Sequence, residues 1–167
     1  MEIAPAELVL DIIETDEAFA RAIFSPHHLK SNGKDLKPNA FYSPRGKNEV
    51  SVNRTKFCTG HFCKNKARAM ERPESTPPKI FRGFALVAHG ILTQAGAFVR
   101  SSKQVDDAAH ADIYYPENNP NEYGQPQTAE LNSIVDTFLP HTKYFADPNA
   151  ESDKWDGEVF WSFGFPS

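Results

Sequence analysis

The stretch Phe81-Arg82-Gly83-Phe84-Ala85-Leu86-Val87-Ala88 is the most apolar run in the chain, and it decides the fold class. A short apolar run of this kind is typical of a strand buried on both faces, so we expect a central strand of a sheet. Two further segments predict strands beside it. Residues 49–52 alternate polar and apolar side chains, and residues 109–115 form an apolar segment that Pro116 closes.

Helical spacing predicts three helices around these strands. Thr15 is a suitable N-cap, and apolar residues follow it at spacings of three and four up to Pro26: Phe19, Ala20, Ile23 and Phe24. Residues 55–70 form a second predicted helix, which Gly60 weakens. Residues 128–139 form the third, with one apolar face. Residues 39–42 are a candidate short strand.

These elements predict an α+β fold: one compact domain over residues 1–167, with a small mixed or antiparallel sheet, two to four helices and long polar loops. Residues 71–79 carry three prolines and are expected to form an internal connector. Residues 117–127 are a polar loop without periodicity. Residues 147–167 form an acidic and aromatic tail that we expect to pack on the domain, with 158–163 as a strand or packed extension.

Composition limits the class of protein. A length of 167 residues suits one domain, and 12% aromatic residues argue against a disordered chain. The chain has no apolar run of about 18 residues, so no membrane contact is expected. The N-terminus lacks the basic region of a secretory signal, and two cysteines make a poor disulfide framework, so we expect a cytoplasmic protein.

Basic charge is concentrated in one window, residues 29–68. This window has ten Lys and Arg but only two acids, a formal charge of +8, so the rest of a chain of net charge −4 carries −12. Such a window indicates binding of an anion, either nucleic acid or a nucleotide. The alternative is a non-enzymatic interaction domain, whose basic window docks on an acidic partner protein or on its own acidic C-terminal half.

The same window contains possible metal ligands, Cys58, His61 and Cys63. On a continuous helix Cys58 and His61 lie about 60° apart and can share a zinc ion, while Cys63 falls on the far side. The alternative is that Cys58 belongs to the core and His61 is solvated. A divalent metal therefore stays a possible cofactor, with Cys58 and His61 as its candidate ligands.

His27-His28, Asn53 and His61 occur in an order that resembles the His-Asn-His nuclease family. The resemblance covers about 35 residues. It implies a phosphodiester hydrolase in which one histidine activates water while others hold a divalent ion. The segment between His28 and Asn53 is longer than the compact hairpin of that family.

Further candidates lie at the ends of predicted strands. Arg54 follows Asn53 and suits bidentate contact with a phosphate, and Arg45 and Lys56 are nearby cations; the alternative for Arg54 is a salt bridge to an acid after residue 70. His110 and Asp112 share one face of a strand, because side chains repeat every two residues. We expect His27, His28, His110 and Asp112 as catalytic candidates, and Arg54, Lys56, Arg45 and Asn53 as ligand-binding candidates.

Overall fold

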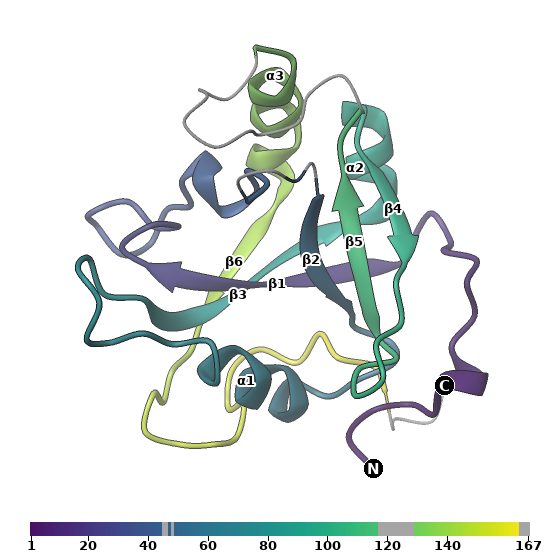
Figure 1. Cartoon of the computed structure of the whole chain (residues 1–167), viewed down its shortest axis with the longest axis horizontal. Coiled ribbons are helices and arrows are strands. Elements are labelled where there is room, and N and C mark those ends of the chain that lie inside the picture. Colours follow the sequence, from purple (N-terminus) through teal and green to yellow (C-terminus); the bar gives the residue numbers. More distant parts are fainter. Residues whose placement is uncertain (45–46, 48, 117–128, 164–167) are drawn as a thin grey trace.

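Strands of the described residues form one antiparallel sheet in the order β4-β5-β2-β1-β3-β6 (Figure 1). The structure is a computed structural model, and it describes residues 1–44, 47, 49–116 and 129–163. The strands are β1 (Ala18–Ser25), β2 (Glu49–Arg54), β3 (Ile80–Ala88), β4 (Phe98–Ser101), β5 (His110–Tyr114) and β6 (Lys143–Ala146). The predicted single α+β domain with a small antiparallel sheet is confirmed. The predicted loop at 117–127 lies outside the described residues.

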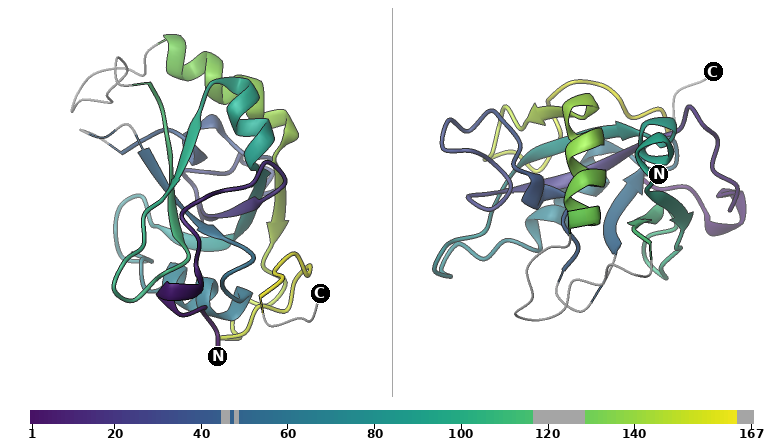
Figure 2. Two further views of the ribbon diagram at one scale, coloured as in Figure 1. Left: turned by 90° about the vertical axis from the view of Figure 1, so that its right-hand side faces the viewer. Right: turned by 90° about the horizontal axis from the view of Figure 1, so that it is seen from above.

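Helices cover both faces of this sheet (Figures 1 and 2). α1 (Gly60–Arg68) lies on one face, while α2 (His89–Ala95) and α3 (Ala129–Phe138) lie on the other. Single 3-10 turns occur at Ala6–Leu8, Pro38–Ala40 and Leu139–His141. The larger core lies under α2 and α3, and a second core, rich in aromatic rings, lies under α1.

The helix predicted after Thr15 is wrong, because residues Ala18–Ser25 form strand β1. Phe19 and Ile23 point into the core under α2 and α3, whereas Ala20 and Phe24 point into the core under α1. Because side chains alternate along a strand, residues four apart share a face, and two such pairs one residue apart give the apparent spacing of three and four. A strand buried on both faces therefore imitated the pattern of an amphipathic helix.

β3 contains the apolar run from Phe81 to Ala88, and it lies between β1 and β6. It is interior to the sheet but not at its centre, where β1 and β2 lie. Gly83 has a φ of +145°, and a Cβ built there would meet the Phe145 carbonyl oxygen at 2.1 Å. Only glycine permits the close crossing of β3 and β6 at this point.

Other predicted elements change in extent. The helix predicted over 55–70 begins at Gly60, because the Thr59 hydroxyl accepts a hydrogen bond from Phe62 N and caps it. Residues 39–42 are not a strand, since Pro38 begins a 3-10 turn there. α2, β4 and β6 were not predicted.

The C-terminal segment runs beside α1 (Figure 1). Residues 158–163 form no strand, but Trp161 is buried against Phe84 and the other rings of that core. Lys64, on α1, is fully buried and donates to the carbonyl groups of Asn149 and Lys154. In the described part of the chain, no helix has the length and apolar character needed to cross a membrane.

Candidate functional site

β1 and β2 pair over only two positions, Phe19 with Arg54 and Ala20 with Asn53, and then diverge. Arg21 lies where they part. Its Nε donates to the Ala40 carbonyl and its Nη1 to the Ser51 carbonyl, both at 3.0 Å. The side chain therefore supplies a donor to β2 where the ladder between the two strands has ended.

A cavity of about 190 Å³ lies beside this fork, between α1 and the sheet. We call it the polar pocket. Its polar lining residues are Arg21, Ser51, Asn53, Lys66, Gln104 and His110, and its apolar lining residues are Ala20, Ala22, Cys63, Ala67, Met70 and Phe84. Two predicted site residues, Asn53 and His110, are brought together here because they face each other in the β2–β5 register.

His110 is held in one orientation. Its Nδ1 lies 2.8 Å from the Ser102 hydroxyl and 3.1 Å from the Ser102 carbonyl oxygen. A carbonyl only accepts, so Nδ1 carries the proton and Nε2 of the neutral ring is left with its lone pair. Nε2 has no partner among the described residues. His110 is only 6% exposed, so its anchored ring is a suitable proton acceptor within the pocket.

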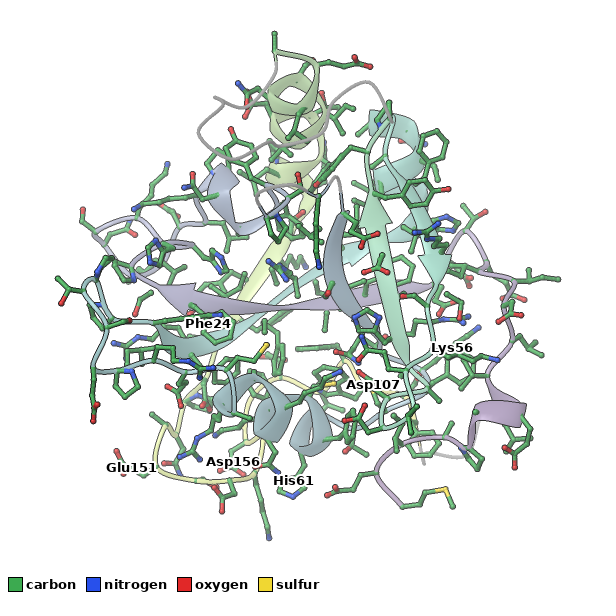
Figure 3. All side chains as sticks on the ribbon, in the orientation of Figure 1. Phe24, Lys56, His61, Asp107, Glu151 and Asp156 are labelled. Atoms are coloured by element: carbon green, nitrogen blue, oxygen red, sulfur yellow. The ribbon has the colours of Figure 1, made fainter. Side chains whose placement is uncertain are left out.

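Asp107 was missed in the sequence, and it organises one wall of the pocket. Its fully buried carboxylate accepts from Asn53 Nδ2 at 2.8 Å and from Ala109 N at 3.1 Å, and it forms an ion pair with Lys66. Figure 3 shows Asp107 on the α1 side of the sheet. Its only sequence signal is an acidic pair, Asp106-Asp107, in a polar segment just before the strand that carries His110.

Asp112 shares a face of β5 with His110, as their spacing predicts. Its side chain is 8% exposed and has no hydrogen bond or ion pair within the described parts of the chain. Its nearest basic neighbour in the register, Arg100, is directed to Glu49 and to the Tyr114 ring. Asp112 is therefore a largely buried residue whose carboxylate is available to a ligand or a protonated neighbour.

Arg54 is not in the polar pocket. Its guanidinium is fully buried, with Nε at 2.5 Å and Nη2 at 3.0 Å from the two oxygens of Glu17, and it also donates to the carbonyls of Leu10 and Ile12. Arg54 therefore forms a salt bridge, which was the alternative to ligand binding. The prediction that its partner is an acid after residue 70 is wrong, because the partner is Glu17. Lys56 lies within 4.0 Å of Glu14 and 3.8 Å of Glu17.

The histidine pair lies after β1, and it does not line the polar pocket. His27 is exposed. His28 Nδ1 accepts from Phe24 N at 3.1 Å, and its ring packs edge-on against Phe24. Burial, with a smaller contribution from Arg21, lowers the pKa of His28 to about 3, so this ring is neutral at physiological pH. Arg45 lies outside the described residues.

The Cys/His cluster divides between two sides of α1. The sulfurs of Cys58 and Cys63 lie 3.3 Å apart in the core, and burial raises the pKa of Cys63. His61 lies on the side of α1 away from the sheet (Figure 3), with Nε2 3.0 Å from Glu2. Cys58 and His61 do not converge because the helix begins only at Gly60.

No group of three or more His, Cys, Asp or Glu side chains suited to a metal ion occurs in the described residues. His28, Asn53 and His61, which carried the nuclease resemblance, lie in three separate places. Comparisons with models of protein families, with curated proteins and with solved structures found no match. The polar pocket, with its anchored His110, is therefore the candidate site on geometry alone.

Proposed function

We propose that the protein binds a small phosphate-bearing ligand in the polar pocket and that His110 transfers protons to and from it. The observation that carries this proposal is the anchoring of His110 through Nδ1, which leaves Nε2 free in a cavity that is also lined by two cations. General bases in enzymes are commonly held by such a second contact.

Arg21 and Lys66 supply the positive charge. Arg21 lies on the face of β1 shared with Phe19 and Ile23, and it lines the pocket where β1 and β2 part. Its Nε and Nη1 contact carbonyl groups, and its Nη2 has no hydrogen-bond partner in the described residues. Burial lowers the pKa of Arg21 to about 10, and it stays a cation at neutral pH. Lys66 is 31% exposed at its side chain and shares its charge with Asp107.

The pocket volume bears on the size of the ligand. A volume of about 190 Å³ corresponds to roughly six water molecules. This suits a phosphoryl group with a small organic portion, and it is small for a length of nucleic-acid duplex. Ala20, Ala22, Phe84 and Met70 give the pocket an apolar wall for the organic portion.

The corresponding reaction is hydrolysis of a phosphoester. His110 Nε2 accepts a proton from water as the water oxygen forms a bond to phosphorus. The bond from phosphorus to the leaving oxygen breaks, and that oxygen takes the proton back from the imidazolium. Arg21 and Lys66 stabilise the charge that develops on the phosphoryl oxygens, and Asp112 stabilises the imidazolium.

His110→Gln tests this function. We expect turnover of a small phosphodiester such as methyl p-nitrophenyl phosphate to fall about 10²- to 10⁴-fold, the usual contribution of a general base. Affinity for the ester should change little, whereas Arg21→Gln should weaken it. His27→Gln is the matched control, since His27 is exposed away from the pocket. Unchanged turnover in His110→Gln, or no ester binding by the unaltered protein, would refute the proposal.

A non-enzymatic interaction domain is the second candidate, and the distribution of charge favours it. The basic residues from 54 to 68 form ion pairs within the chain, whereas Lys30, Lys34 and Lys37 have no ion pair among the described residues. If the protein is an interaction domain, these three lysines dock on an acidic partner. Their replacement by Gln would then abolish binding, and His110→Gln would have no effect.

A further inference from the structure

We propose a second binding site, for a small aromatic carboxylate, at the N-terminus of α1. The cavity there has a volume of about 310 Å³. Its lining residues are Met1, Thr59, Gly60, His61, Trp155, Gly157, Val159, Trp161 and Phe163. None of them lines the polar pocket, so this site does not depend on the function proposed above.

Trp161 gives the first reason for a ligand. Trp161 is 5% exposed, and among the residues that the structure describes its buried Nε1 has no hydrogen-bond partner. This atom lies directly over the first residue of α1, because a Cβ built on Gly60 would be 2.5 Å from it. Buried indole N–H groups are normally paired, so an acceptor is missing at this position.

The helix terminus gives the second reason. Thr59 satisfies Phe62 N, but the amides of Gly60 and His61 have no acceptor in the described residues. They point out of the positive end of the nine-residue helix, where an anion is favoured. Trp161 Nε1 lies over Gly60 at this end of α1, so the proposed carboxylate would accept from the indole N–H and from these amides.

The surrounding residues define the rest of the ligand. Trp155 donates its own Nε1 to the Glu158 carbonyl at 2.9 Å, so it presents an apolar ring to the cavity. Val159 and Phe163 extend that apolar wall. Glu2 does not line the cavity, and its carboxylate is directed to His61, whose Nε2 lies 3.0 Å away. A flat apolar body with a single carboxylate fits these surroundings, whereas a bare phosphate would leave the apolar wall uncovered.

Tryptophan fluorescence tests the site, because the chain has two tryptophans and both line this cavity. We expect phenylacetate to cause a saturable change in emission. Phenylacetamide, which keeps the ring and an acceptor oxygen but loses the charge, should bind about tenfold more weakly. Benzyltrimethylammonium tests the opposite possibility, a cation held by the aromatic rings.

Matched variants separate the donor from the ring. Trp161→Phe keeps an aromatic ring but loses the unpaired N–H, and phenylacetate affinity should fall tenfold or more. Trp155→Phe loses an N–H that is already paired, so affinity should stay within about threefold. Each variant keeps one tryptophan as reporter. His110→Gln should bind phenylacetate normally, which distinguishes this site from the polar pocket.

A measurement on the unaltered chain does not depend on how the variants fold. In ¹H–¹⁵N correlation spectra, phenylacetate should shift the Trp161 indole N–H and the Gly60 amide, and it should leave the Trp155 indole less affected. The proposal is overturned by the absence of saturable binding at millimolar phenylacetate. Equal affinity of Trp161→Phe, or tighter binding of the amide or the ammonium probe, overturns it as well.

Discussion

Two basic side chains of the described residues, Arg54 and Lys64, are completely buried, and each meets a buried carboxylate. Arg54 pairs with Glu17, and Lys64 Nζ lies 2.9 Å from Asp147. Removal of a charge from water is so costly that these cations are stable in the interior only with such partners. Much of the basic window therefore contributes to the folded structure itself and is not available to an external anion.

His28 contributes to the pH dependence of the free energy of unfolding at acid pH. Above a pH of about 6.5 its ring is neutral in both the folded and the unfolded chain, so it has no effect on stability. Below that pH the unfolded chain binds a proton, while the folded ring, with its pKa lowered to about 3 by burial, does not. The free energy of unfolding should therefore fall by up to about 1.4 kcal/mol per pH unit as the pH decreases.

Urea unfolding of His28→Asn between about pH 4 and 7 measures this contribution. Asparagine cannot titrate, so the variant should lose less stability on acidification than the unaltered protein. His27→Asn, at the neighbouring exposed position, should keep the original slope. An acid dependence of His28→Asn equal to that of the unaltered protein would show that His28 is not responsible.

At the scale of elements, β1 shows how local pattern and final structure diverge. Its two faces contact different cores, so apolar residues occur at positions that a half-buried strand would leave polar. Arg21 occupies the face shared with Phe19 and Ile23, and its guanidinium reaches the carbonyls of Ala40 and Ser51. Arg21, the one charged residue of β1, therefore lies at the fork beside the polar pocket.

The crossing of β3 and β6 depends on Gly83. Gly83→Ala should destabilise the fold by about 3 kcal/mol or more, because the added Cβ would meet the Phe145 carbonyl and φ is positive. Gly33→Ala is the control, since φ is +69° there but no atom lies within 4 Å of the new Cβ. It should cost about 1 kcal/mol. Equal losses in urea unfolding would mean that the steric contact is unimportant.

At the scale of the whole molecule, the C-terminal segment completes the layer that contains α1. Asp147 and the carbonyls of Asn149 and Lys154 surround Lys64 Nζ at 2.8 to 2.9 Å. Arg68 pairs with Asp153 at 2.8 Å, and Trp161 fills the core under α1. Residues more than eighty positions apart in the chain therefore share one network of charges and rings.

Deletion of residues 147–167 should destabilise the protein strongly. It removes Trp161 from the core, and loss of a large buried aromatic side chain costs about 3 to 5 kcal/mol. Asp147→Asn in the full chain leaves Lys64 buried without its carboxylate and should by itself cost about 3 to 5 kcal/mol. Thermal unfolding followed by circular dichroism measures both changes. A shortened chain as stable as the full one would contradict the structural role of the segment.

Each element that was predicted correctly has a regular pattern of apolar residues along its whole length. The alternation in β2, the apolar run in β3 and the single apolar face of α3 each depend on near neighbours in the chain. β4 and β6 have four residues each and α2 has seven, too few for a period to stand out. In the candidate site, the shared face of His110 and Asp112 was predictable, but the approach of Asn53 depends on the β2–β5 register.

The sequence by itself determined the α+β class, most interior strands and the face shared by His110 and Asp112, because these properties depend on periodicity over a few residues. Only the tertiary structure decided which charges are neutralised. Glu17 meets Arg54 from 37 positions away, and Asp107 approaches Lys66 from 41 positions away. Such pairs form only when strands and helices pack, since the free energy of burial, and not local spacing, selects them.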